Sequence, residues 1–280
     1  MSFGPLIAPE VMLASSTPVR LLDAGPGAAA FTSGHLAGAH HADLNRWLST
    51  ASDPTFDPAN GGRHPLPSPS AWARRLGLWA IAADTPVVVY DDVAGGNGAC
   101  RLWWMLRAFG HSKVAVLDGG LAEAKAAGLV VTTEEPIPPT PLPPYPGDRW
   151  LLPTVAIQTI EQYLEDPARK VLDVRSRERW RGESEPIDPV AGRIPGSVNL
   201  PYTENLGPNG RFKSAEALRA MYLRLLDGTT SDHLAVHCGS GVTACHTLLA
   251  LELAGLPDSS LYVGSYSEWC RSGRPLDKKL

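Results

Sequence analysis

The chain is poor in cysteine. Its 280 residues include four, Cys100, Cys238, Cys245 and Cys270, and no two of them form a Cys-x-x-Cys pair. That spacing gives little support to a structural zinc site, and so few cysteines in so long a chain argue against a disulfide framework. We therefore expect free thiols in a reducing compartment, and we expect neither a metal nor a cofactor.

An excess of charge of one sign and long apolar runs are also missing. The 25 basic and 29 acidic side chains give a formal net charge of -4, and no basic stripe is present, which argues against nucleic acid as a partner. The apolar stretch LLALELAGL already contains Glu252, and the first residues lack the pattern of a secretory signal. We expect a cytoplasmic protein that does not engage a membrane.

Proline, by contrast, is concentrated in one place. Seven prolines between Pro136 and Pro146 exclude a helix there and predict an extended, semi-rigid connector over residues 134–150. This linker separates a first domain, residues 1–133, from a second domain, residues 151–280. Both parts have an ordinary domain size.

The two parts repeat one plan. Residues 99–119 align with residues 244–264 at a constant offset of 145 without a gap. In both parts, short runs rich in valine and leucine alternate with helical segments that end in glycine. We predict an α/β fold of two tandem domains, each a mainly parallel sheet flanked by helices. Ligands of such sheets bind beyond the carboxyl ends of the strands.

Cys238 lies at such a strand end. The apolar run LAVH ends at His237, the loop CGSGVTA follows, and a helical pattern begins near Val242. Glycines let successive N–H groups point inward, and a helix N-terminus adds further donors, so the loop suits a thiolate or a persulfide. The first half has Asp91 at the matching position and no nucleophile. We therefore expect chemistry in the second half only.

A cysteine phosphatase would use a similar loop. Such enzymes place an arginine six positions after the cysteine to hold phosphate, whereas this chain has Ala244 there. No arginine or lysine occurs between Cys238 and Leu256. The loop therefore favours sulfur transfer over phosphate chemistry.

In these motifs the chain resembles the two-domain rhodanese-type sulfurtransferases. Within that family, the resemblance is closest to the 3-mercaptopyruvate sulfurtransferases. The loop CGSGVTA matches the family's catalytic loop, and YVGSYSEW matches its closing motif, with Tyr266 where tryptophan is usual. VVVYDD, RLWWMLRAFGH and LDGG resemble the inactive N-terminal half. The resemblance implies that Cys238 takes a sulfane sulfur as a persulfide. An acceptor, which the sequence leaves open between a small thiol, thioredoxin and cyanide, then removes that sulfur.

The resemblance also implies roles for individual residues. Ser240 would handle protons at the donor carbonyl with His35 and an aspartate that the sequence does not place. Arg179, in RERWRGESEP, would bind the donor carboxylate through its planar fork. A second arginine of the mercaptopyruvate members is replaced here by Ile187, and Arg181 is a candidate substitute. The remaining substrate-binding positions are those of the loop backbone: Gly239, Gly241, Val242 and Thr243.

The donor is inferred from the loop. Thiosulfate-preferring relatives carry basic residues directly after the cysteine, whereas this chain has Gly239 and Ser240, which favours 3-mercaptopyruvate. Two alternatives stay open: a thiosulfate sulfurtransferase, or a non-catalytic module that carries persulfide to a partner. We expect Cys245 and Cys100, which occupy matching positions, to be buried helix residues rather than redox groups.

Overall fold

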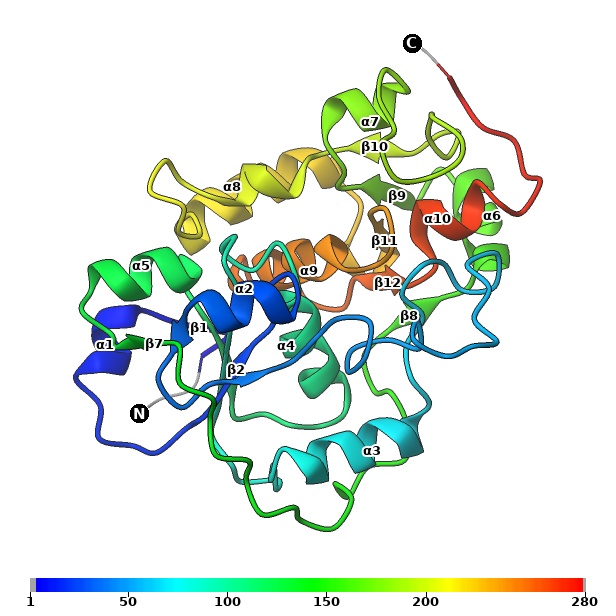
Figure 1. Cartoon of the computed structure of the whole chain (residues 1–280). Coiled ribbons are helices and arrows are strands. Elements are labelled where there is room, and N and C mark those ends of the chain that lie inside the picture. The colour runs from blue at the N-terminus through cyan, green and yellow to red at the C-terminus, as the bar shows by residue number, and fades with distance from the viewer. Residues whose placement is uncertain (1–3, 279–280) are drawn as a thin grey trace. The chain divides into compact units, whose positions relative to one another are not determined.

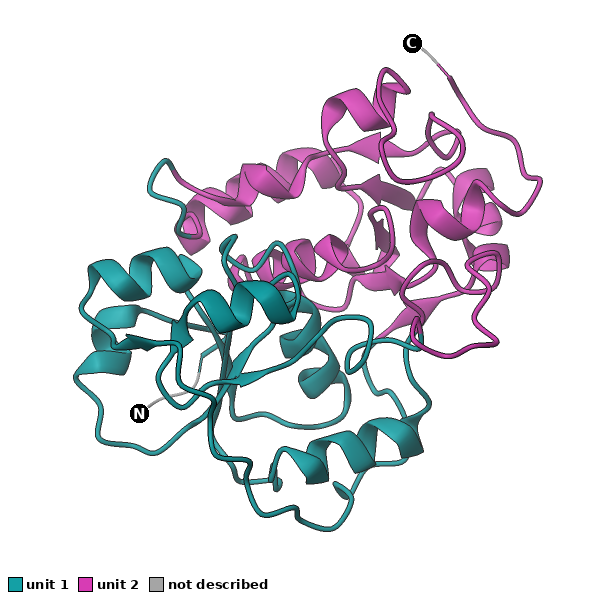
Figure 2. Cartoon of the chain, in the orientation of Figure 1, with its two compact units in different colours: residues 1–50, 66–152, 208–211 teal, residues 51–65, 153–207, 212–280 magenta. Residues whose placement is uncertain are grey.

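The computed structural model describes residues 4–278 (Figure 1), and the chain divides into two compact units (Figure 2). Unit 1 runs through Thr50, resumes at Leu66–Leu152 and includes Pro208–Arg211. Unit 2 comprises Ala51–Pro65, Pro153–Gly207 and the chain from Phe212 onward. Residues 51–65 therefore come from the first half of the sequence but belong to the second unit. No helix in the described part of the chain has the length and apolar character needed to cross a membrane.

Unit 1 is built on a five-stranded parallel sheet with the order β1-β6-β5-β2-β4. All four residues of the central strand β5 are buried, as expected for a parallel strand covered on both faces. The strands are β1 Leu6–Ile7, β2 Arg20–Asp23, β4 His40–His41, β5 Val87–Tyr90 and β6 Val114–Leu117. A separate antiparallel pair joins β3 His35–Leu36 to β7 Val131–Thr132.

One helix of unit 1, α3 at Pro69–Leu78, begins at a capping signal that can be read in the sequence. Ser68 caps α3 by accepting a hydrogen bond from the N–H of Ala71, and Pro69 occupies the first helical position. The helix α4 is buried along nearly its whole length, since it packs on β5 and β6. The helices are α1 Pro9–Leu13, α2 Ala28–Ser33, α3 Pro69–Leu78, α4 Ala99–Ala108 and α5 Gly120–Ala126.

Unit 2 repeats the sheet with the order β10-β9-β11-β12-β8, again all parallel. Its strands are β8 Thr154–Val155, β9 Lys170–Asp173, β10 Val198–Asn199, β11 Leu234–His237 and β12 Ser260–Tyr262. Its α-helices are α6 Ile157–Glu165, α7 Arg177–Arg181, α8 Ala215–Leu226, α9 Thr243–Leu253 and α10 Ser265–Trp269, and two short 3₁₀ turns are η1 Tyr202–Asn205 and η2 Ser231–His233. In Figure 1 the yellow α8 lies beside the orange α9.

The strand orders of the two units correspond. Reading from β4 to β1 in unit 1 gives the same succession as reading from β10 to β8 in unit 2. The strand before Asp91 and the strand before Cys238 are therefore both central in their sheets. The prediction of two tandem domains, each with a parallel sheet and flanking helices, is confirmed.

The proline-rich segment is extended, but it is not a free connector. The N–H of Leu142 donates to the carbonyl of Gly77 at 2.9 Å, and the N–H of Tyr145 donates to the carbonyl of Ala73 at 3.0 Å. A Cβ on Gly77 would approach the carbonyl oxygen of Leu142 to 2.7 Å, so only glycine allows this approach. The segment therefore packs along α3 as part of unit 1.

Candidate active site

Cys238 follows the central strand β11 and is held by the backbone around it. Its N–H donates to the hydroxyl of Ser265 at 3.2 Å, and its carbonyl accepts from the N–H of Tyr266 at 3.0 Å. The next carbonyl, that of Gly239, accepts from the N–H of Ser267 at 2.9 Å. The start of α10 thus fixes the loop, and the cysteine is 2% exposed.

The loop after Cys238 presents backbone donors. Gly241 has a φ of +74°, the left-handed conformation that glycine adopts most readily, and the turn leads into α9 with Val242 as N-cap and Thr243 as first helical residue. Among the described residues, the N–H groups of Gly239, Ser240 and Val242 donate to no protein acceptor. Together with the helix N-terminus, these groups can bind an anion.

The matching loop of unit 1 shows what this backbone shape binds. The carboxylate of Asp91 accepts hydrogen bonds from the N–H groups of Val93, Gly95, Asn97 and Ala99 at 2.7–3.1 Å. Burial raises the pKa of this carboxyl, while the four donors oppose that rise. Unit 1 therefore carries its own anion at the place where unit 2 carries a cysteine.

The residue that contacts Ser240 is His64, in place of the predicted His35. Nδ1 of His64 lies 2.8 Å from the hydroxyl oxygen of Ser240, and the direction of this hydrogen bond depends on the imidazole tautomer. Little in the sequence predicts this contact, because His64 lies in the loop GGRHPLP, which has no helix or strand pattern. The sequence feature that favours a functional role for His64 is its place on a loop beside glycines and prolines, since binding and catalytic residues often lie on loops.

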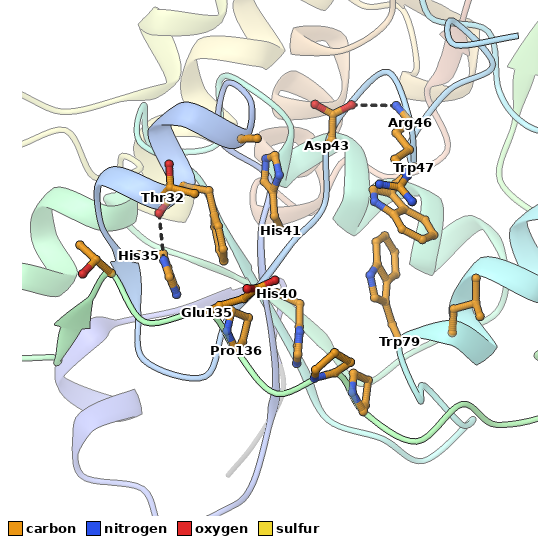
Figure 3. Close-up of a pocket in the computed structure, with 16 residues that line it drawn as sticks. Thr32, His35, His40, His41, Asp43, Arg46, Trp47, Trp79, Glu135 and Pro136 are labelled. Atoms are coloured by element: carbon orange, nitrogen blue, oxygen red, sulfur yellow. Dashed lines mark hydrogen bonds between the residues drawn. The ribbon is translucent and has the colours of Figure 1, made fainter.

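His35 lines a cavity of unit 1 (Figure 3). Its Nδ1 donates to the carbonyl of Phe31 at 2.9 Å, and its ring stacks on the ring of Phe31 with centroids 3.8 Å apart. The cavity has a volume of about 1050 Å³, and His41 and Trp47 also line it. Within unit 1, His35 thus has a packing role, and within unit 2 the histidine that contacts Ser240 is His64.

Residues 61–64 are fastened to α10. The N–H of Gly61 donates to the carboxylate of Glu268 at 3.0 Å, and the N–H of Arg63 donates to the hydroxyl of Ser267 at 3.0 Å. Between them, Gly62 has a φ of +78° and lies against the carbonyl of Gly264. These two hydrogen bonds therefore fix the backbone of the segment from which the His64 side chain extends.

Arg179 is anchored by a carboxylate beside the loop. Its Nε and Nη2 donate to the two oxygens of Glu185 at 3.1 and 2.7 Å, and Nη2 lies 3.6 Å from Asp188. Burial disfavours the ionised form of Glu185, but its hydrogen bonds from Arg179 and from the N–H of Asp188 outweigh burial, and its pKa is lowered. Glu185 is therefore ionised at neutral pH and holds the guanidinium in place.

A buried arginine ties this pair to the sheet. Arg175 donates to Glu185 at 3.1 Å and to both oxygens of Asp173, at the end of β9, at 2.7–3.1 Å. Its guanidinium carbon lies 3.7 Å from the ring centroid of Tyr266, a cation–π contact. The tyrosine that replaces the usual tryptophan thus packs on the arginine that supports Glu185.

The domain content and the sequence of this chain both match known proteins. A model of the rhodanese-like domain matches residues 10–127 and again residues 156–272. The chain belongs to the rhodanese family. It is 46% identical to a Pseudomonas aeruginosa protein named "Probable 3-mercaptopyruvate sulfurtransferase", over 91% of this chain and 87% of that protein. It is 40% identical to the Bos taurus thiosulfate sulfurtransferase, over 75% of this chain and 71% of that one.

The same relationship appears among solved structures. The 3-mercaptopyruvate sulfurtransferase from Leishmania major superposes with a TM-score of 0.77 at 30% identity, covering 92% of this rhodanese and 71% of that chain. Relatives named for either donor therefore share this fold. Their names alone do not choose between mercaptopyruvate and thiosulfate.

The structure also shows the surroundings of the remaining positions predicted from the sequence. Ile187 is 57% exposed, and Arg181 pairs loosely with Glu183 at 3.9 Å on an exposed part of α7. Cys245 and Cys100 are fully buried in α9 and α4, which confirms their packing role. Burial raises the pKa of the half-buried Cys270 thiol, so it is protonated at neutral pH.

His237 has a structural role at the strand exit. Its Nδ1–H donates to the carbonyl of Cys238 at 3.1 Å, and its Nε2 lies 3.8 Å from Asp173. Burial lowers the pKa of the imidazole, which therefore stays neutral into pH values below its ordinary titration range. It fixes the backbone of Cys238 rather than supplying a positive charge to the sulfur.

Proposed function

We propose that this protein transfers a sulfane sulfur from 3-mercaptopyruvate to a thiophilic acceptor through a persulfide on Cys238. The observation that supports the donor assignment is the hydrogen bond between His64 and Ser240, two residues after Cys238, because this pair can act as a proton relay. Such a pair is useful only if the donor's leaving fragment must exchange a proton.

The chemistry of 3-mercaptopyruvate has that requirement. The Cys238 thiolate attacks the donor sulfur, the carbon–sulfur bond breaks, and its electron pair is left on carbon as the enolate of pyruvate. The proton of the donor thiol must reach that carbon, giving pyruvate and the enzyme persulfide. Ser240 and His64 can carry this proton, and the N–H groups of the loop can hold the anionic persulfide.

Thiosulfate needs no such relay. Attack of the thiolate on its outer sulfur breaks the sulfur–sulfur bond and releases sulfite, and no proton moves. The two alternatives considered from the sequence, a thiosulfate sulfurtransferase and a non-catalytic persulfide carrier, therefore leave the Ser240–His64 contact without a chemical purpose.

The test compares two donors in three proteins. For wild-type enzyme we expect a higher kcat/KM with 3-mercaptopyruvate than with thiosulfate. Ser240→Ala should lower the mercaptopyruvate value by about 10²–10⁴-fold, the usual contribution of positioned acid–base groups, and change the thiosulfate value little. Cys238→Ser should abolish both reactions, and mass spectrometry of donor-treated wild type should place one added sulfur on Cys238.

Two results would contradict the proposal in different ways. A wild-type preference for thiosulfate, with equal losses for both donors in Ser240→Ala, would reject mercaptopyruvate and keep the persulfide mechanism. Persulfide formation on Cys238 without turnover on any small acceptor would instead identify a carrier.

A further inference from the structure

The cavity of unit 1 in Figure 3 has no role in the proposed sulfur transfer. All the residues that line it belong to unit 1, whereas Cys238, Ser240 and His64 belong to unit 2. Its volume of about 1050 Å³ is at the upper end of the range of small-molecule sites. Like such sites, it combines a few polar groups with an apolar lining, and this lining includes Phe31, Trp47, Trp79 and three prolines between residues 136 and 139.

Aromatic rings form two walls of the cavity. The ring of Phe31 stacks with the rings of His35 and His41, at centroid distances of 3.8 and 5.2 Å. The indole rings of Trp47 and Trp79 form the second wall, with centroids 5.1 Å apart and an interplanar angle of 41°. These rings are already packed against one another, so a flat aromatic ligand would bind with little cost for ordering side chains.

His40 offers a hydrogen-bond donor to this cavity. Its Nε2 lies 3.4 Å from Nη1 of Arg20, and Nε2 must be the acceptor because a guanidinium only donates. Burial, together with the charge of Arg20, lowers the pKa of His40, so the ring is neutral at pH 7 and carries its proton on Nδ1. This Nδ1–H has no partner among the described residues and is available to a bound acceptor.

Two arginines at this cavity lack a carboxylate partner among the described residues. Arg20 is half-buried, and its Nε has no hydrogen-bond partner in the described part of the chain. Arg46 lies over an indole ring at 5.0 Å from the centroid. Of the carboxylates that line the cavity, Asp43 accepts the backbone N–H of Arg46, and Glu135 is exposed to solvent. Because a half-buried charge attracts a counter-ion more strongly than an exposed one, the cavity favours an anion.

We propose that this cavity binds a small aromatic carboxylate, with its ring against Trp47 and Trp79 and its carboxylate on the Nδ1–H of His40. Arg20 polarises the imidazole through its hydrogen bond, which strengthens the donor on the other nitrogen. The charges of Arg20 and Arg46 stabilise the bound anion, and the aromatic wall supplies ring contacts. None of these residues takes part in the proposed sulfur transfer, so the inference does not depend on the sulfur donor.

Three probes that share one ring and differ in charge test the site. They are para-fluorophenylacetate, its neutral amide para-fluorophenylacetamide, and the cation para-fluorophenethylamine. Titrations of the full-length protein followed by fluorine NMR give a Kd for each. We expect the carboxylate to bind about 10–100-fold more tightly than the amide, the difference made by one charge-assisted hydrogen bond. The amine should bind most weakly.

Variants locate the binding. His40→Phe keeps a ring but removes the donor, so it should raise the Kd of the carboxylate by about 10–100-fold and change that of the amide little. Trp47→Leu should raise both values by about 3–10-fold, because the ring contact is lost. Arg74→Met is the control, since it removes an exposed arginine of α3 that does not line this cavity. His40→Gln keeps an N–H donor and should retain the preference for the carboxylate, which keeps the test informative if His40→Phe folds poorly.

Three results would contradict the proposal. An unchanged Kd of the carboxylate in both His40→Phe and Trp47→Leu would place the probe elsewhere on the protein. Tighter binding of the amine than of the carboxylate would show a site for cations. Failure of every probe to bind at millimolar concentration would show that the cavity is not a site for aromatic ligands of this size.

Discussion

At one position of the repeat, a single residue makes the loops of the two units chemically different. Asp91 and Cys238 both follow the central strand of their sheet, and both are followed by a turn into a helix. In unit 1 the side chain itself fills the backbone nest through four N–H groups. In unit 2 the shorter cysteine leaves loop donors available for an anion that arrives with the substrate.

At this scale we predict that Asp91→Ala destabilises the protein strongly. Four N–H donors would lose a charged acceptor, and the loss should be on the order of 3–5 kcal/mol in the free energy of unfolding of unit 1. Urea titrations followed by circular dichroism measure it. Asp92→Ala is the matched control, because this exposed carboxylate accepts, among the described residues, a hydrogen bond only from the side chain of Asn97. Equal, small losses in both variants would show that the nest does not depend on its carboxylate.

At the scale of an element, a segment without helix or strand positions two functional side chains. Residues 61–64 are fixed by hydrogen bonds to α10, and α10 in turn fixes the backbone of Cys238. The same short helix therefore sets both the nucleophile and the His64 side chain. This arrangement explains why Gly61 and Gly62 both adopt positive φ values, +88° and +78°.

The two glycines allow a matched test. Gly62→Ala should lower mercaptopyruvate kcat/KM by at least tenfold, because its Cβ would overlap the carbonyl of Gly264 and push His64 and Arg63 away from the loop. Gly61→Ala carries the same kind of backbone strain, but its Cβ meets only Pro65 at 3.4 Å. Its activity should therefore stay near wild type. Similar losses for the two variants would mean that backbone strain, and not the displaced segment, is responsible.

At the scale of the whole molecule, the units do not coincide with the halves of the sequence. Residues 51–65 lie before the proline-rich segment in the chain, yet they belong to unit 2 with the catalytic loop. The second half alone contains Cys238, Ser240 and Arg179 but lacks His64 and Arg63. Under the proposed mechanism, the second half of the sequence therefore needs a segment from the first half.

We predict that a chain beginning at Asp148 forms the Cys238 persulfide from mercaptopyruvate at least 100-fold more slowly than the full chain. Circular dichroism must first show that this fragment is folded. Full-length His64→Gln provides the parallel measurement, because it removes the imidazole and leaves the rest of the chain present. A folded fragment that matches the full chain in rate would show that residues 51–65 are dispensable.

Local patterns in the sequence were enough for the fold and for the position of Cys238 at a strand end. Buried parallel strands, glycine-terminated helices and a constant repeat offset are short-range features, and they predicted two parallel-sheet domains and Cys238 at a strand end. The roles of Cys245 and Cys100 as buried helix residues followed from the same repeat. The tertiary structure decided which distant side chains reach the loop. His64 contacts Ser240, and Arg63 lies with Arg179 beside Gly239. Both come from an irregular loop whose position depends on contacts more than 200 residues away in sequence. No periodicity records such contacts, so only the folded chain reveals them.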